Sequence, residues 1–200
     1  MRSLASARGS AQRHLRRVDP VLRRVIRRAT AHWTSRRSGD PIWGLVRIII
    51  AQQVSTGAAR TLAARVLAAY PLLATDPDVL GSRVHTRRLR ALGLTTLKAK
   101  CVRAVLARAP VLRRALRESD RLEAVLREIK GIGPWTVAIF RIMILREPDV
   151  LPLGDAALNA LVACHYGSSD KLGCVSDAWR PYRSVACWYL WRSLRNPPLG

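Results

Sequence analysis

The residue best suited to chemistry in this 200-residue chain is Asp155. It lies 22 residues after Gly133, directly behind the loop Pro152-Leu153-Gly154 and at the start of a helical pattern. A lone aspartate there is most simply the N-cap of the helix, because its side chain accepts a backbone N–H. A fixed carboxylate can also stabilise the positive charge that develops on a sugar when a purine N-glycosidic bond breaks. It can orient or deprotonate the attacking water as well.

A second candidate is the segment Lys130-Gly131-Ile132-Gly133-Pro134, which lies between two helical patterns. The two glycines allow a sharp turn with unobstructed amides, and the proline pre-sets the first helical turn. Free N–H groups and the positive end of the helix dipole then point at one spot, which suits a phosphate and gives affinity without sequence preference. The alternative is an ordinary turn between helices. The basic character of the chain favours DNA binding.

Aromatic side chains are scarce and gather late in the chain, where they can stack on a base. They include Trp135, Tyr166, Trp179, Tyr182, Trp188, Tyr189 and Trp191. An N-alkylated purine is a cation, and a tryptophan face attracts it with roughly 1–2 kcal/mol per contact. One or two of these tryptophans are expected in the core instead.

The chain is strongly basic, with 35 lysines and arginines against 13 acids, a formal net charge of +22. Such a charge indicates a polyanionic partner, with nucleic acid the first choice and an anionic membrane surface the second. Most of the basic residues are arginines, so a GC-rich genome accounts for part of the excess. No apolar run approaches the ~20 residues of a membrane span, and we expect no membrane association.

The four cysteines have spacings that fit neither a zinc site nor an iron–sulfur loop; they are Cys101, Cys164, Cys174 and Cys187. We therefore expect no iron–sulfur cluster and interpret each as a small buried residue in a reducing compartment. The expected location is the cytoplasm, with association to the nucleoid in a bacterium. Residues 1–17 are rich in Arg and Ser and also resemble an organellar transit peptide, so organellar targeting stays open as an alternative.

Caps and apolar spacing predict an all-α protein. Asp19-Pro20 and Asp40-Pro41 each place an N-cap before a proline. Ser55 or Thr56, and Thr95 or Thr96, can cap two further helices, and no segment alternates as a strand does. The expected helices cover residues 20–29, 42–50, 56–70, 97–108, 122–127 and 135–145, a segment starting at 155, and residues 179–194.

Five ordered motifs together resemble the helix–hairpin–helix glycosylase superfamily, in particular the bacterial 3-methyladenine DNA glycosylases of type II. They are WGLVRIIIAQQVS (residues 43–55), LRALGLTTLKAK (89–100), LREIKGIGPWT (126–136), LGD (153–155) and PYRSVACWYLWR (181–192). The resemblance spans roughly residues 18–195. Five motifs in order are far more specific than any one of them.

The resemblance implies roles for individual positions. Asp155 falls on the essential aspartate of the superfamily, and Trp135 and Trp191 fall on aromatic residues that line the base pocket. The implied DNA-binding residues are Ile50, Gln52 and Gln53, in the segment that wedges into the duplex during base flipping, and Lys130, Gly131, Gly133 and Thr136 at the hairpin. The main-chain carbonyls of Arg127, Ile129 and Ile132 fall where a hairpin can hold a structural Na⁺ or K⁺, and no other cofactor is implied.

This chain departs from relatives in informative ways. Bifunctional members carry a catalytic lysine where this chain has Trp135, so no Schiff base and no strand-cleaving lyase step are expected. Two further pocket aromatics of some relatives are Ala156 and Ile139 here, which leaves the substrate range open. We also expect neither the carboxy-terminal iron–sulfur cysteines of other branches nor the amino-terminal sheet domain of the longest enzymes.

The expected domain organisation follows from these motifs. Residues 1–17 form a basic arm, disordered or helical, that reaches along DNA. Residues 18–195 form two interleaved helical subdomains, with the hairpin at 122–145 flanking a central active-site cleft, and residues 196–200 are a tail.

The expected function is a monofunctional glycosylase of base excision repair. It would release 3-methyladenine and 7-methylguanine from double-stranded DNA that contains damaged bases, acting as a monomer. Two alternatives stay open. One is a non-catalytic helix–hairpin–helix DNA-binding protein, and the other is a glycosylase for hypoxanthine, etheno-adenine or a mismatched base.

Overall fold

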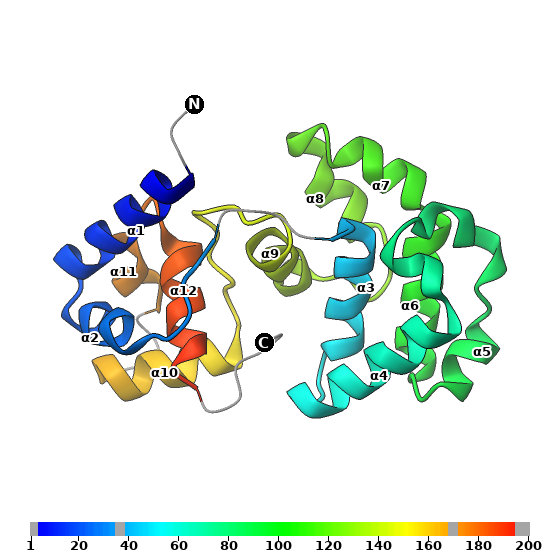
Figure 1. Cartoon of the computed structure of the whole chain (residues 1–200), viewed down its shortest axis with the longest axis horizontal. Helices are drawn as coiled ribbons and strands as arrows, with labels where there is room; N and C mark the ends of the chain where they lie inside the picture. The colour runs from blue at the N-terminus through cyan, green and yellow to red at the C-terminus, as the bar shows by residue number, and fades with distance from the viewer. Residues whose placement is uncertain (1–3, 35–38, 168–171, 195–200) are drawn as a thin grey trace. The chain divides into compact units, whose positions relative to one another are not determined.

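The computed structural model describes residues 4–34, 39–167 and 172–194. Within them the protein is all helical, as predicted (Figure 1), and no helix there is both long and apolar enough to cross a membrane. The elements are α1 (Leu4–Val18), α2 (Pro20–Arg28), α3 (Pro41–Ala51), α4 (Thr56–Ala69), the 3-10 helices η1 (Pro71–Ala74) and η2 (Pro77–Arg83), α5 (Thr86–Ala91), α6 (Thr96–Ala107), α7 (Ala109–Ala115), α8 (Ser119–Arg127), α9 (Pro134–Met143), α10 (Ala156–Tyr166), α11 (Leu172–Asp177) and α12 (Arg183–Arg192). The predicted tail, residues 196–200, and residues 1–3 of the predicted arm lie outside the described residues.

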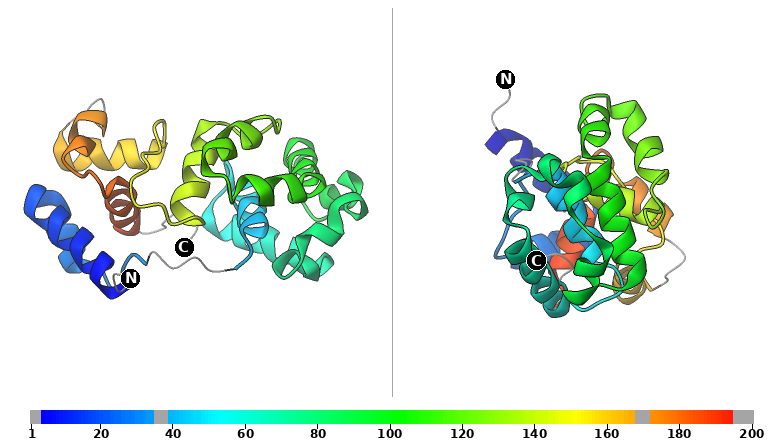
Figure 2. Two further views of the ribbon diagram at one scale, coloured as in Figure 1. Left: turned by 90° about the horizontal axis from the view of Figure 1, so that it is seen from above. Right: turned by 90° about the vertical axis from the view of Figure 1, so that its right-hand side faces the viewer.

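The chain divides into two compact units, which agrees with the predicted two helical subdomains. Of the described residues, unit 1 takes 4–34, 141–167 and 172–194, and unit 2 takes 39–140. The first unit therefore takes residues from both sides of the second, so the two are interleaved in the sequence. Figure 2 shows the helices of each unit from two further directions.

Unit 2 is built around α3, which packs against α4 and α6. The helix is buried nearly all round, with Leu45 and Ile49 fully inaccessible, as its continuous apolar sequence predicts. Asp40 caps it by accepting the N–H of Ile42 at 2.8 Å. The guanidinium of Arg113 on α7 bonds the same carboxylate at 2.7 Å, so the start of the core helix is also tied to α7.

Unit 1 contains a buried carboxylate, Asp19, that joins three elements. Its Oδ1 accepts the N–H of Leu22 at 2.9 Å and caps α2. Its Oδ2 accepts the hydroxyl of Tyr166 and the indole N–H of Trp179, each at 2.7 Å. Tyr166 ends α10, and Trp179 precedes α12, so Asp19 fixes α2 to both. Burial and the hydrogen bond to Asp19 raise the pKa of Tyr166, which therefore stays a neutral donor.

Residues 4–17 are not a free arm. They form α1 and, with the side chains of Ala11 and Leu15 buried, pack against α2 as part of unit 1. Ala11 and Leu15 are four residues apart, so they lie on the same side of this otherwise basic helix and pack it into unit 1.

The predicted helix 179–194 is wrong in its first turn, because α12 begins at Arg183. Pro181 has no backbone N–H and disfavours helical geometry in the residue before it. The prediction of four buried cysteines is also half wrong. Cys101 and Cys187 are buried, but Cys164 and Cys174 are exposed, since they lie on the outer faces of α10 and α11.

Candidate functional site

Asp155 is buried, with 6% of its surface exposed, at the start of α10 in unit 1. Its Oδ1 accepts the backbone N–H of Leu158 at 2.8 Å, which confirms the predicted N-cap. The same oxygen accepts the indole N–H of Trp191 at 3.1 Å. Two donors on one oxygen hold the carboxylate in a defined orientation, as a group that must face developing positive charge requires.

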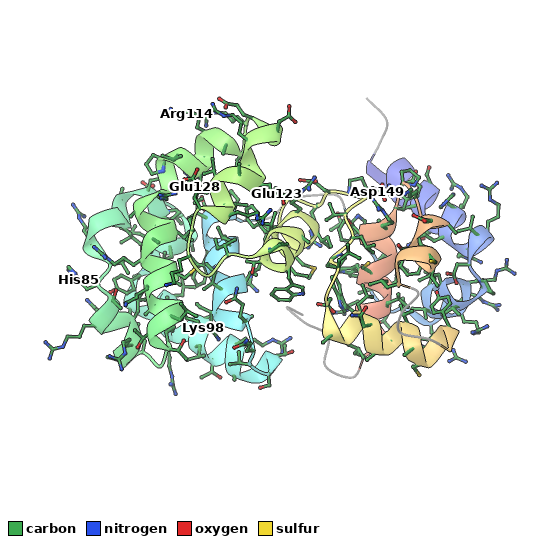
Figure 3. All side chains as sticks on the ribbon, turned by 180° about the vertical axis from the view of Figure 1, so that it is seen from behind. His85, Lys98, Arg114, Glu123, Glu128 and Asp149 are labelled. Atoms are coloured by element: carbon green, nitrogen blue, oxygen red, sulfur yellow. The ribbon has the colours of Figure 1, made fainter. Side chains whose placement is uncertain are left out.

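The loop that leads into Asp155 is fastened to α12. The hydroxyl of Ser184 accepts the N–H of Val150 at 2.8 Å, and the guanidinium of Arg183 bonds Asp149 at 2.7 Å; Figure 3 labels Asp149. Burial alone would raise the pKa of Asp149, but its hydrogen bonds and charge contact with Arg183 hold that pKa below its usual value. The helix that carries Trp191 thus also positions the chain on the other side of Asp155.

Cys187 lies one turn before Trp191 on α12 and is fully buried. Burial, and then the nearby Asp155 carboxylate, raise the pKa of its thiol. The thiol is therefore neutral at physiological pH.

The predicted hairpin lies in unit 2, between α8 and α9. Gly131 has φ +103°, a backbone conformation that L side chains rarely adopt. A Cβ built on it would lie 3.1 Å from the sulfur of Cys101 on α6, whereas one on Gly133 meets nothing within 4 Å. The N–H of Val137 donates to the carbonyl of Gly133 at 3.1 Å, so the helical bonds begin there. The turn therefore needs glycine at 131 for geometry, and it keeps the space beside Gly133 open.

Gln52, predicted to contact DNA, braces this hairpin. Its amide Nε2 donates to the hydroxyl of Thr136 at 2.9 Å and lies 3.3 Å from the carbonyl of Gly131. Thr136, also predicted to bind DNA, has its side chain buried and occupied by this bond. The structure thus shows these two side chains joined to each other across the hairpin.

The residues of the predicted wedge segment, 50–53, differ in their exposure to solvent. The side chain of Ile50 is fully buried in unit 2, so the structure does not support its predicted contact with DNA. Gln53 is exposed and has φ +54°, which turns the chain sharply between α3 and α4. Gln53 is accordingly the side chain of this segment that stands free to reach a ligand.

Lys98 on α6 is a residue that the sequence reasoning missed. It is buried, and its ammonium donates to the carbonyl of Ile50 at 2.8 Å, at the end of α3 (Figure 3). Desolvation lowers its pKa. The sequence does contain an indication that Lys98 is buried. It stands at i, i+4, i+7 spacing with Val102 and Val105, which are core residues of the same helix.

Of the remaining predicted residues, Trp135 is half-buried in unit 2 and Trp191 is 2% exposed in unit 1. Lys130 is exposed at the hairpin. Of the three carbonyls predicted to hold a cation, that of Ile129 accepts the N–H of Ile132 at 3.0 Å. Their roles as pocket walls, phosphate contact and cation ligands stay predictions.

The effect of the Gln52 brace can be measured against its neighbour. We expect Gln52→Ala to lower the free energy of unfolding by about 1–3 kcal/mol, because it leaves the buried Thr136 hydroxyl without its donor. DNA affinity should fall with it, since the hairpin loses its support. Gln53→Ala is the control: its exposed side chain should cost less than about 0.5 kcal/mol. Urea unfolding of both variants measures the difference. Equal free energies of unfolding would show that Gln52 does not stabilise the hairpin.

Lys98 should make stability depend on pH in a predictable direction. An unburied lysine titrates near about pH 10.4, and the folded pKa lies lower, so between the two values the unfolded chain binds more protons. The free energy of unfolding should therefore rise with pH across that interval. In Lys98→Met this rise should be absent. Denaturant unfolding of both proteins from neutral pH upward measures it, and parallel curves would contradict the prediction.

Known proteins resemble this chain in sequence and in fold. No family model matches the chain. It is 33% identical over 195 residues to a probable bifunctional transcriptional activator/DNA repair enzyme AlkA of Mycobacterium tuberculosis, a match that covers 90% of this chain and 38% of that protein. The chain thus spans well under half the length of this curated relative.

Solved structures are matched over more of their own length. A DNA-3-methyladenine glycosidase of Bacillus halodurans is 30% identical with a TM-score of 0.72, covering 91% of this chain and 88% of that one. The 3-methyladenine DNA glycosylase Mag1 of Schizosaccharomyces pombe, solved with abasic DNA, shares the fold at 23% identity and a TM-score of 0.75, covering 92% and 95%. The chain therefore belongs to the 3-methyladenine DNA glycosylase family of helix–hairpin–helix proteins.

Proposed function

We propose that this protein is a monofunctional DNA glycosylase of base excision repair, which hydrolyses the N-glycosidic bond of alkylated purines such as 3-methyladenine and 7-methylguanine. The observation that carries the proposal is Asp155, a buried carboxylate held by the indole N–H of Trp191 at the start of α10. A plain N-cap needs neither the burial nor the second donor.

The chemistry assigned to Asp155 follows from charge. As the bond to the base breaks, the sugar becomes oxocarbenium-like, and a fixed carboxylate stabilises it and orients or deprotonates the incoming water. An alkylated purine already carries positive charge, so its glycosidic bond is weakened and little further activation is required. Trp135 stands where bifunctional relatives have a lysine, so the product is an abasic site and a free base, with no strand cleavage.

The partner proposed is double-stranded DNA, and the base is flipped out of the stack before hydrolysis. The hairpin supports this, because the open space beside Gly133 leaves the start of α9 accessible to a phosphate. Lys130 adds an exposed charge there. The relative solved with abasic DNA is consistent with such a partner. We further propose a monomer, with a monovalent cation on the hairpin carbonyls as its one bound ion.

A second candidate is a DNA-binding protein of this fold without turnover. The retention of Asp155 with its Trp191 partner favours the enzyme. A third keeps the enzyme and changes the lesion to hypoxanthine, etheno-adenine or a mismatched base, since Ala156 and the buried Ile139 replace pocket aromatics of some relatives.

The deciding experiment is chromatography of the bases that the protein frees from methylated, deaminated and mismatched duplexes. Methylated duplex should yield free methylpurine and an intact strand until the abasic site is cleaved by alkali. Release of hypoxanthine alone would move the assignment to another lesion, and no release from any duplex would leave only the binding protein.

A further inference from the structure

The arginines of α1 and α2 form a surface that the proposed chemistry does not use. Residues 1–39 contain eleven arginines and a single acid, Asp19. Seven of these arginines have exposed side chains in the two helices, and we call them the α1–α2 basic face: Arg13, Arg16, Arg17, Arg23, Arg24, Arg27 and Arg28. Figure 3 shows nitrogen-tipped side chains projecting outward from these two helices.

Helical spacing gathers these side chains on one side of each helix. In α1 the arginines follow i, i+3, i+4, while Ala11 and Leu15 are buried on the other side. In α2 they stand opposite the buried Val21, Leu22 and Ile26. The Nε of Arg23 donates to the carbonyl of Arg16 at 2.8 Å, so the arginines of the two helices adjoin.

The charge of the basic face is not neutralised by acids of the described residues. None of the seven arginines makes an ion pair with any residue that the structure describes. Asp19 lies inside unit 1, where its oxygens accept three hydrogen bonds. Elsewhere arginines are paired, as Arg113 is with Asp40 and Arg183 with Asp149. The charge of the basic face is therefore available to a partner outside the chain.

The side chains of the basic face indicate which class of partner it binds. Guanidinium groups present planar forks that match phosphate oxygens. A helix that binds a lipid surface inserts an apolar side, but the apolar sides of α1 and α2 are already buried within unit 1. A phosphate backbone needs only the charged side, so the observation favours nucleic acid over a membrane, to which this face offers charge but no apolar side.

We propose that the α1–α2 basic face binds the sugar–phosphate backbone of duplex DNA, as a contact surface in unit 1 additional to the hairpin in unit 2. It supplies affinity without sequence preference. The proposal rests on the proposed function only in taking duplex DNA as the partner, and it assigns no part of the chemistry to these arginines.

The test compares two proteins from which the same charge is removed. The face variant carries Arg→Gln at Arg17, Arg24, Arg27 and Arg28. The control carries Arg→Gln at four exposed arginines of unit 2, namely Arg65, Arg83, Arg87 and Arg90. Binding to an undamaged duplex oligonucleotide is measured across a range of salt concentrations. Removing one arginine–phosphate interaction lowers the slope of log K against log salt by about 0.9, so the slope of the face variant should fall by up to about 3.6 and that of the control much less.

An equal fall of the slope in the two variants would overturn the proposal, because net charge alone would then explain the affinity. It would also be overturned if the face variant kept its DNA slope. Loss of binding to vesicles of phosphatidylserine and phosphatidylcholine in that variant would then assign the face to a membrane. Circular dichroism checks the fold. If the fourfold variant unfolds, the single variants Arg24→Gln and Arg28→Gln must each lower the slope by about 0.9. Release of methylpurine is scored separately, so a protein with the predicted slopes but no release would refute the proposed function alone.

Discussion

Asp155→Asn is expected to lower release of methylpurine from methylated DNA by about 10²–10³-fold, the usual effect of removing one electrostatic interaction with a transition state. The fold should survive. The amide oxygen of asparagine can still accept the N–H groups of Leu158 and Trp191, and asparagine caps helices about as well as aspartate. Loss of the charge at the start of α10 should cost no more than about 1 kcal/mol. Base release and urea unfolding, measured on the same preparation, separate the two effects.

Asp155→Ala is the matched comparison, because it removes both the charge and the acceptor. The missing cap costs about 0.5–2 kcal/mol, and the buried indole N–H of Trp191 is left without its partner at about 1–3 kcal/mol. If Asp155→Asn kept wild-type release, the carboxylate would be a cap only. If both variants were equally unstable, charge rather than the hydrogen bonds would hold this part of unit 1 together.

Gly131→Ala is expected to give the largest loss of stability at the hairpin. The backbone conformation at φ +103° costs a non-glycine residue about 1–3 kcal/mol. The new methyl group would also lie 3.1 Å from the sulfur of Cys101, which must move within a buried part of unit 2. DNA affinity should fall as well, since the turn that exposes the amides is distorted. Urea unfolding and binding to a duplex oligonucleotide measure the two losses.

Gly133→Ala separates stability from binding. A Cβ there meets nothing within 4 Å, and the residue has no positive φ, so the free energy of unfolding should change by less than about 1 kcal/mol. The methyl group would, however, occupy the space through which a phosphate approaches the start of α9. We expect DNA affinity to fall in a protein of nearly unchanged stability. Unchanged affinity would mean that the hairpin is an ordinary turn.

The features that the sequence predicts best are helix starts. Asp19, Asp40 and Asp155 were each predicted as N-caps, and each accepts a backbone N–H two or three residues ahead. A cap is decided by its own residue and the next few, so its signal is local. The glycines of the hairpin were predicted for the same reason, since the backbone conformation of Gly131 is determined locally, within the turn.

The hydrogen-bond partners of buried polar groups cannot be predicted from neighbouring residues in this way. Gln52 bonds two hairpin residues that lie 79 and 84 positions later in the chain. Lys98 donates to a carbonyl at the end of another helix. The second donor to Asp155 comes from Trp191, for which the resemblance implied only a place in the pocket wall. These bonds depend on how α3 packs with α6 in unit 2 and how α10 packs with α12 in unit 1. The hydrophobic periodicity of a single segment does not contain that information. The resemblance identified Gln52, Asp155 and Trp191 but not Lys98, and the contacts of all four come from the structure.

Helix α10 is anchored at each end by a hydrogen bond between a carboxylate and an aromatic side chain. At its start Asp155 accepts from Trp191, and at its end Tyr166 donates to Asp19. Movement of either end would break a hydrogen bond to a buried carboxylate, so these two bonds restrain both ends of α10 within unit 1. The consequence is kinetic. In the proposed glycosylase the carboxylate would need no reorientation between one damaged base and the next, and we expect the slow steps to lie in the DNA and in the docking of the protein on it.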